Sequence, residues 1–198
     1  MDGFERRREQ KKKAILQAAM DLFMAHGTQK VSVAEIADKA NVSQVTIYNY
    51  FGNKHNLVEE AIVYCIHQIW SEYEALFDSD LPFIDKIRNA MFFKIRSTTN
   101  IHPDTFAAFL QKYASGNAFL ETFLQEKMMP RMVALIEDGK REGYVDPKLS
   151  NESILMFFQM FKEYMQKEEV YPHLQRMTED LTKLFFYGLV GQKDNLLD

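Results

Sequence analysis

The sequence predicts an all-α protein, and three observations support this. Gly and Pro are scarce, with 8 and 5 among 198 residues, so few positions interrupt a helix. Long stretches repeat apolar residues at the three- and four-residue spacing of one helix face. Hydrophobic residues make up 46% of the chain and charged residues 26%, which suits a substantial core and argues against a disordered chain.

The apolar spacing divides the chain into successive helical segments. Pro82 and Pro103 each open one, and Pro130 predicts a kink within a longer one. The helices are expected over about residues 7–25, 33–40, 44–51, 54–77, 82–97, 103–114, 117–142 and 171–187, with one more that ends near 167 and for which Asp146-Pro147 and Ser150 both offer a start. We predict a three-helix domain over residues 1–53 and a helical second domain over 54–198.

Residues 31–51 carry two helix starts separated by a short turn. Ser32 and Glu35 have the spacing of a capping box, and Ser43 is a second N-cap. Asn41 tolerates left-handed backbone angles and can turn the chain between the two helices. Two short helices joined in this way predict a helix-turn-helix.

The outward face of the second of these helices is mostly hydrogen-bonding or aromatic and has no excess of charge. A solvated helix face ordinarily carries Lys and Glu, whereas a helix that enters the major groove needs donors, acceptors and groups that contact methyls. We therefore predict that this face binds DNA through Gln44, Val45, Thr46, Tyr48, Asn49 and Tyr50.

The charge distribution agrees with this prediction although the net charge is −4. Residues 1–55 hold nine Lys and Arg against six Asp and Glu, and the rest of the chain is acidic. Two basic triplets, 6–8 and 11–13, stand at the start. A basic head on an acidic body favours local phosphate binding with repulsion elsewhere.

The helix-turn-helix residues resemble the TetR family of bacterial regulators. The matching pattern is Ser32-Val33-x-x-Ile36-Ala37-x-x-Ala40-x-Val42-Ser43-x-x-Thr46-Ile47-Tyr48-x-Tyr50-Phe51-x-x-Lys54-x-x-Leu57. The resemblance implies about nine helices and a phosphate contact at Lys54, and we expect Ser32 to hold the DNA backbone too. It also implies a DNA-binding transcriptional regulator, most simply a ligand-responsive repressor that binds a pseudo-palindromic double-stranded operator.

The second domain is rich in large, soft side chains. The chain has 16 Phe, 9 Tyr and 11 Met, and such residues suit an adaptable apolar cavity, although any single one is more simply part of the core. Inward residues of this domain line a ligand cavity in proteins of the resembled family. We predict a small apolar or aromatic effector, held by Ile66, Trp70, Tyr73, Phe92, Phe106, Phe109, Phe123 and Phe158.

The two predicted C-terminal helices, 150–167 and 171–187, carry apolar stripes broader than a surface helix needs. Two-fold pairing of these helices would give a homodimer with a four-helix interface. Such a dimer would place two recognition helices about 34–36 Å apart on DNA.

Other chemistry has no pattern in its favour. We find no Gly-rich phosphate loop, no His-Glu-x-x-His and no Cys-x-x-Cys, so no catalytic site, metal or cofactor is predicted. No apolar run is long enough to span a membrane, and the single Cys65 suits a reducing cytoplasm. Two alternatives stay open: an effector-independent helix-turn-helix protein for nucleoid or protein interaction, and an enzyme with a hydrophobic substrate.

Overall fold

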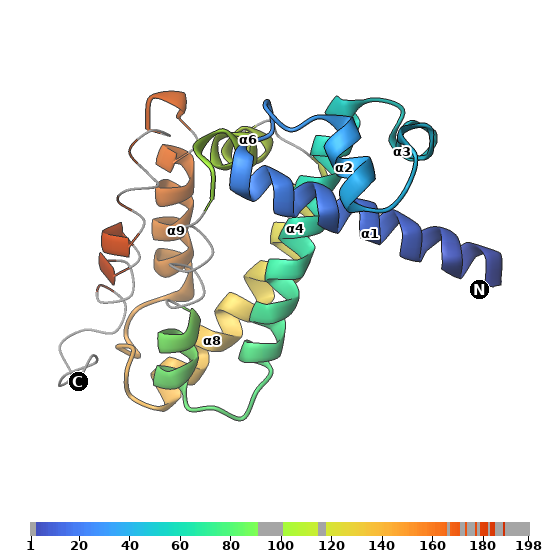
Figure 1. Cartoon of the computed structure of the whole chain (residues 1–198). Helices are drawn as coiled ribbons and strands as arrows, with labels where there is room; N and C mark the ends of the chain where they lie inside the picture. The colour runs from blue at the N-terminus through green and yellow to red at the C-terminus, as the bar shows by residue number, and fades with distance from the viewer. Residues whose placement is uncertain are drawn as a thin grey trace. The chain divides into compact units, whose positions relative to one another are not determined.

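In the computed structural model, residues 3–90, 101–114, 118–165 and 167–170 are described, together with single positions between 173 and 188 (Figure 1). Every regular element in these ranges is helical, which confirms the all-α prediction. The predicted helix over 171–187 and the second half of that over 82–97 lie largely outside the described residues.

The chain forms two compact units. The first contains Met1–Ser71 and Asn100–Phe109, and the second contains Glu72–Thr99 and Leu110–Asp198. Two helices belong partly to each unit: α4 (Lys54–Phe77) and α6 (Pro103–Ala114). The compact units therefore do not divide at residue 53, and the assignment of separate functions to residues 1–53 and 54–198 remains a proposal.

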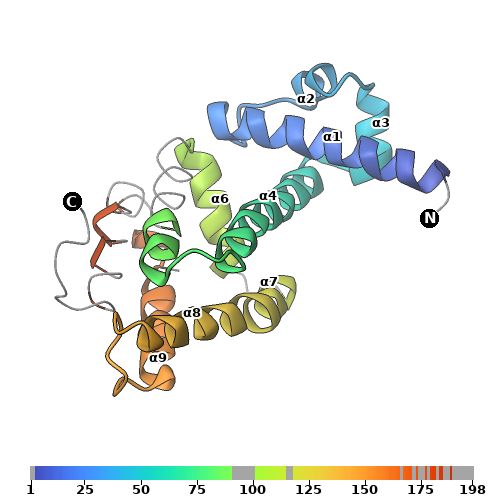
Figure 2. The same cartoon turned by 90° about the horizontal axis from the view of Figure 1, so that it is seen from below.

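The first unit packs α1 (Gly3–His26), α2 (Val33–Lys39), α3 (Gln44–Phe51) and the start of α4 around one core (Figure 2). Its fully buried side chains include Phe23, Ile36, Ile47 and Leu57. Helix α1 begins four residues before the predicted Arg7. The Arg, Glu and Gln residues at its start are good helix formers, and Glu5 in the first turn complements the helix dipole.

The start of α6 is bound to the end of α1 within this unit. The backbone N–H of His102 donates to the Met24 carbonyl at 2.9 Å, and the Thr105 hydroxyl donates to the Phe23 carbonyl at 2.6 Å. Gly27 has a φ of 86°, and a Cβ there would lie 2.6 Å from Nδ1 of His102. A glycine is therefore required where α1 ends against α6.

The second unit is built on a helical stretch at 83–90, α8 (Met129–Arg141) and α9 (Asn151–Met165). Its core joins Phe83, Ile87, Leu135, Ile136, Val145 and Ile154. Buried Lys86 donates from Nζ to the Phe77 carbonyl at 2.8 Å, and the Glu142 carboxylate accepts from the Phe83 N–H at 3.0 Å. These bonds satisfy the end of α4 and the start of the 83–90 helix.

We predicted one continuous α-helix over 117–142 with a kink at Pro130. The prediction of continuous α-helical hydrogen bonding is wrong, because a π-helical turn interrupts it. The structure has α7 (Ala118–Phe123), a π-helical turn η1 (Leu124–Met128) and then α8, followed after α9 by a short 3₁₀ turn η2 (Glu168–Val170). Pro130 has no N–H and its ring crowds the carbonyl four residues earlier, so the ladder widens before it.

Candidate nucleic-acid interface

The two short helices of the first unit are fixed by the caps that the sequence predicts. The Glu35 N–H donates to Oγ of Ser32 at 3.2 Å, and the Ser32 N–H donates to the Glu35 carboxylate at 2.7 Å. The Ser32 hydroxyl also donates to that carboxylate, which with the backbone bond lowers the pKa of Glu35. Ser43 caps α3 by accepting from the Thr46 N–H at 3.1 Å.

The turn between these helices is a Schellman motif with asparagine at its left-handed position. Asn41 has a φ of 52°, and among the described residues no other non-glycine residue has a positive φ. The Val42 N–H donates to the Ala37 carbonyl and the Asn41 N–H donates to the Asp38 carbonyl, which satisfies the end of α2. The geometry confirms the predicted helix-turn-helix.

Helix α3 turns one apolar face inward and an uncharged face outward. Ile47 and Phe51 are buried in the core of the first unit. On the outer side, Val45 is 66% exposed and Tyr48 47% exposed, and Gln44 and Asn49 are exposed with them. The structure thus brings four of the predicted DNA-binding side chains together on one accessible face.

The other predicted DNA-binding residues make contacts inside the protein. The Tyr50 hydroxyl donates to the Arg8 carbonyl at 3.3 Å, and the Arg8 guanidinium lies 5.9 Å from the centre of the Tyr50 ring. Lys54 donates from Nζ to the Gln29 carbonyl at 3.0 Å, and Thr46 shares a hydroxyl contact of 2.9 Å with Ser43. A lysine has three donors, so this bond leaves Lys54 able to bind a phosphate.

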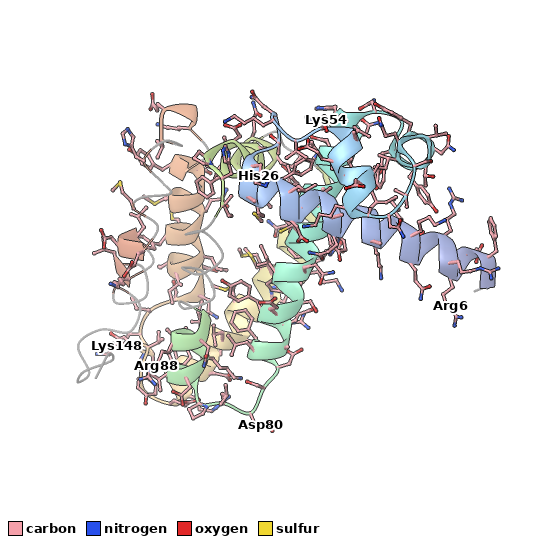
Figure 3. All side chains as sticks on the ribbon, in the orientation of Figure 1. Arg6, His26, Lys54, Asp80, Arg88 and Lys148 are labelled. Atoms are coloured by element: carbon pink, nitrogen blue, oxygen red, sulfur yellow. The ribbon has the colours of Figure 1, made fainter. Side chains whose placement is uncertain are left out.

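Some basic residues of α1 make contacts within the protein, and others are exposed to solvent. Lys12 forms an ion pair of 2.6 Å with Glu60 and lies 5.9 Å from the centre of the Phe51 ring. Arg6, Arg7, Lys11 and Lys13 are exposed. Figure 3 shows Arg6 near the free end of α1 and Lys54 at the start of α4. Sequence reasoning missed the Arg8–Tyr50 and Lys12–Glu60 contacts, because nothing local marks a partner more than 40 residues away.

The predicted effector residues are divided between the two units. Ile66 and Trp70 of α4 are buried in the first unit, with the half-buried Phe106 and Phe109 of α6. Tyr73 and Phe123 belong to the second unit, as does Phe158, whose side chain is not described, and Phe92 lies outside the described residues. A common cavity for these residues therefore stays a prediction.

Tyr73 is a half-buried member of this set with a polar end. Its hydroxyl donates to the Ala90 carbonyl at 3.4 Å, within the second unit. Burial, with a smaller effect of the Glu72 carboxylate, raises the pKa of Tyr73 to about 12. The hydroxyl is therefore a neutral donor at physiological pH.

An apolar stripe follows the outer face of α9. Met156, Phe157, Met160 and Tyr164 are between 51% and 67% exposed, and they follow the spacing of one helix face. No helix in the described part of the chain is long and apolar enough to cross a membrane, and its His, Cys, Asp and Glu side chains form no group of three that could hold a metal ion.

The comparison with known families identifies the N-terminal region. The family model for "Bacterial regulatory proteins, tetR family" matches residues 15–61. This range includes most of α1, all of α2 and α3, and the start of α4. It contains the eight residues between Ser32 and Lys54 that are predicted above to bind DNA, and it begins after the two basic triplets of α1.

Individual proteins are similar over most of the chain. The HTH-type transcriptional regulator YhgD of Bacillus subtilis is 26% identical over 85% of this chain and 90% of its own. The HTH-type transcriptional repressor KstR2 of Mycobacterium tuberculosis is 22% identical over 72% and 73%. The solved structure of the regulator FadR from Bacillus subtilis, in complex with stearoyl-CoA, has a TM-score of 0.57 at 17% identity over 89% and 98%. That structural likeness establishes the fold.

Proposed function

This chain belongs to the tetR family of bacterial regulatory proteins and is a DNA-binding transcriptional regulator, and we propose that it is a repressor that binds a pseudo-palindromic operator as a homodimer. The observation that carries the proposal is the exposed, uncharged face of α3, held by buried Ile47 and Phe51 on its other side. A face of this kind gives α3 hydrogen-bonding groups for base edges.

We assign two roles to the interface residues. The exposed Gln44, Val45, Tyr48 and Asn49 enter the major groove, while Ser32, Thr46, Tyr50 and Lys54 contact the sugar-phosphate backbone. The positive dipole ends at the starts of α2 and α3 support the second role, since they attract phosphate. The exposed cations of α1 add affinity that depends on salt.

The partner in the dimer is a second copy of the chain. The exposed stripe of α9 supports this, because monomers rarely leave large apolar side chains in a row on the surface. Two-fold pairing buries the stripe of each copy against the other, together with the predicted helix over 171–187. In such a dimer, the two copies of α3 would bind two half-sites whose centres lie about one helical turn of DNA apart.

We propose that a small apolar or aromatic effector weakens operator binding. The abundance of Phe, Tyr and Met supports an apolar cavity. Both α4 and α6 extend from one compact unit into the other, so a ligand that repositions the second unit acts on the first through two helices. The effector must bind the state that is not bound to DNA more tightly, since only differential affinity shifts the equilibrium.

This function is tested by selecting, at physiological salt concentration, the fragments of the source organism's genomic DNA that the full chain binds. We expect enrichment of a sequence with two-fold symmetry and a ratio of specific to non-specific affinity of about 10³ or more. A steep salt dependence without any enriched sequence would instead favour the effector-independent nucleoid protein.

A further inference from the structure

We propose that α3 selects A·T base pairs, with Val45 packing on the C5-methyl of a thymine and Asn49 binding an adenine. The inference rests on the proposed function and names the class of DNA sequence that this site reads. It concerns two exposed residues of a helix that is described throughout its length.

The packing of α3 fixes which side chains face outward. Ile47 and Phe51 are 1% and 3% exposed and define the inner side. At 3.6 residues per turn, Val45 and Asn49 lie one turn apart on the side opposite Ile47. Val45 and Asn49 are thus the residues of α3 that point most directly away from the core.

The exposure of Val45 is informative because the side chain contributes little to the stability of the free protein. At 66% exposed it adds little to the core, and a β-branched side chain is a weaker helix former than Ala, Leu or Lys. A single exposed apolar residue is ordinary on a protein surface. Here it stands beside the 47% exposed Tyr48 on a helix with polar neighbours, which indicates an apolar group on the partner.

Thymine supplies that apolar group. Its C5-methyl is the feature of the major groove that an aliphatic side chain contacts. The amide of Asn49 has a donor and an acceptor on one group, which matches N7 and the N6 amino group of adenine. Both residues therefore favour an A·T pair over a G·C pair.

Helix α3 lacks the side chains that most often bind guanine in the major groove. Guanine is most often bound by the paired donors of Arg, or by Lys, and α3 contains neither. Of the cations from neighbouring elements, Arg8 lies over the Tyr50 ring, and Lys54 is assigned above to the DNA backbone. The helix therefore has no cationic side chain of its own for a G·C pair.

The test uses the full chain and a duplex found by fragment selection, with single base analogues in each half-site. Replacing dT by dU removes only the C5-methyl, and replacing dA by 7-deaza-dA removes only the N7 acceptor. For the wild type, we expect one dU to weaken binding about fourfold, the value for one buried methyl-sized group. One 7-deaza-dA should weaken it about tenfold, as expected for a disrupted two-bond contact.

The variants separate the two residues. Val45→Ala, which loses both γ-methyl groups, should show a smaller dU effect than the wild type, and Asn49→Ala should bind the dA and 7-deaza-dA duplexes equally. Leu81→Ala, which shortens an exposed apolar residue of the second unit, should keep the wild-type response to both analogues.

Two results would overturn the inference while leaving the function intact. One is a selected sequence with G·C pairs where α3 protects the bases. The other is a dU or 7-deaza-dA effect that persists unchanged in the matching alanine variant. Failure to select any sequence is a different result, because it removes the proposed function itself.

Discussion

The hydroxyl of Thr105, at the start of α6, donates a 2.6 Å hydrogen bond to the carbonyl of Phe23, near the end of α1. Both residues are completely buried, although 82 positions separate them. The bond belongs to the first compact unit and ties the start of α6 to the end of α1. It gives the end of α1 a partner that no local sequence pattern indicates.

Replacing Thr105 by Val should therefore destabilise the first unit. The change keeps the shape of the side chain and removes its hydroxyl, and the Phe23 carbonyl keeps its bond from the Gly27 N–H at 2.9 Å. We expect a loss of about 1 kcal/mol in the free energy of unfolding, measured by urea denaturation. Thr105→Val as stable as the wild type in urea would argue against a contribution from this hydrogen bond.

Gly27→Ala tests the same junction through the backbone. The alanine must adopt a φ of 86° and place its Cβ 2.6 Å from Nδ1 of His102, so strain and a clash add together. We expect the variant to lose about 1–2 kcal/mol or more. Gly3→Ala is the matched control, because nothing lies within 4 Å of its Cβ. Equal thermal stability of the two variants would contradict the close approach of α6 to α1.

The capping box of α2 should make stability depend on pH. Hydrogen bonds from the Ser32 hydroxyl and N–H favour the charged carboxylate and lower the pKa of Glu35 in the folded state. Its contribution is complete above the unfolded pKa of 4.5 and is lost as the pH falls through the folded pKa. Glu35→Gln should therefore lower the melting temperature at pH 7 and show a smaller difference from wild type at pH 3. An equal difference at both pH values would refute this.

The apolar stripe of α9 should control the oligomeric state. Met160 is 60% exposed, and its replacement by Glu would place a charge inside the proposed two-fold interface. We expect Met160→Glu to sediment as a monomer at concentrations where the wild type is a dimer. Gln159→Glu adds the same charge at the exposed neighbouring position and should leave the dimer intact. A dimer in both variants would exclude this stripe from the interface.

The helix-turn-helix could be predicted in detail because its signals are local. Ser32, Glu35, Asn41 and Ser43 each act on backbone groups within a few positions, and the structure shows each in its expected role. The start of α6 at Pro103 and both ends of α4 were predictable for the same reason.

Contacts between distant residues could not be predicted in this way. Tyr50 resembles its exposed neighbours in sequence, yet its hydroxyl bonds to Arg8, 42 positions away. Lys54 likewise bonds to Gln29 across 25 positions. Pro130 indicated an irregularity in the helix. A kink and a π-helical turn can both accommodate a residue that has no N–H, and only packing decides between them.

The same limit applies to the effector residues. The spacing of Ile66, Trp70 and Tyr73 indicates a buried face of α4, but it does not distinguish the core of one unit from a cavity. The structure assigns Trp70 to the first unit and Tyr73 to the second. An apolar side chain has the same pattern in both settings, so periodicity cannot name the lining of a binding site.

The central claim, that α3 reads bases while residues around it hold the backbone, is tested most directly by the ratio of affinities for a selected operator and a scrambled duplex. Asn49→Ala should reduce this ratio about tenfold or more, because it removes a base contact. Lys54→Gln should weaken binding to both duplexes by the same factor and lower the slope of log affinity against log salt by about 0.9, because it removes one phosphate contact. An unchanged ratio in Asn49→Ala, with full affinity for both duplexes, would contradict the account.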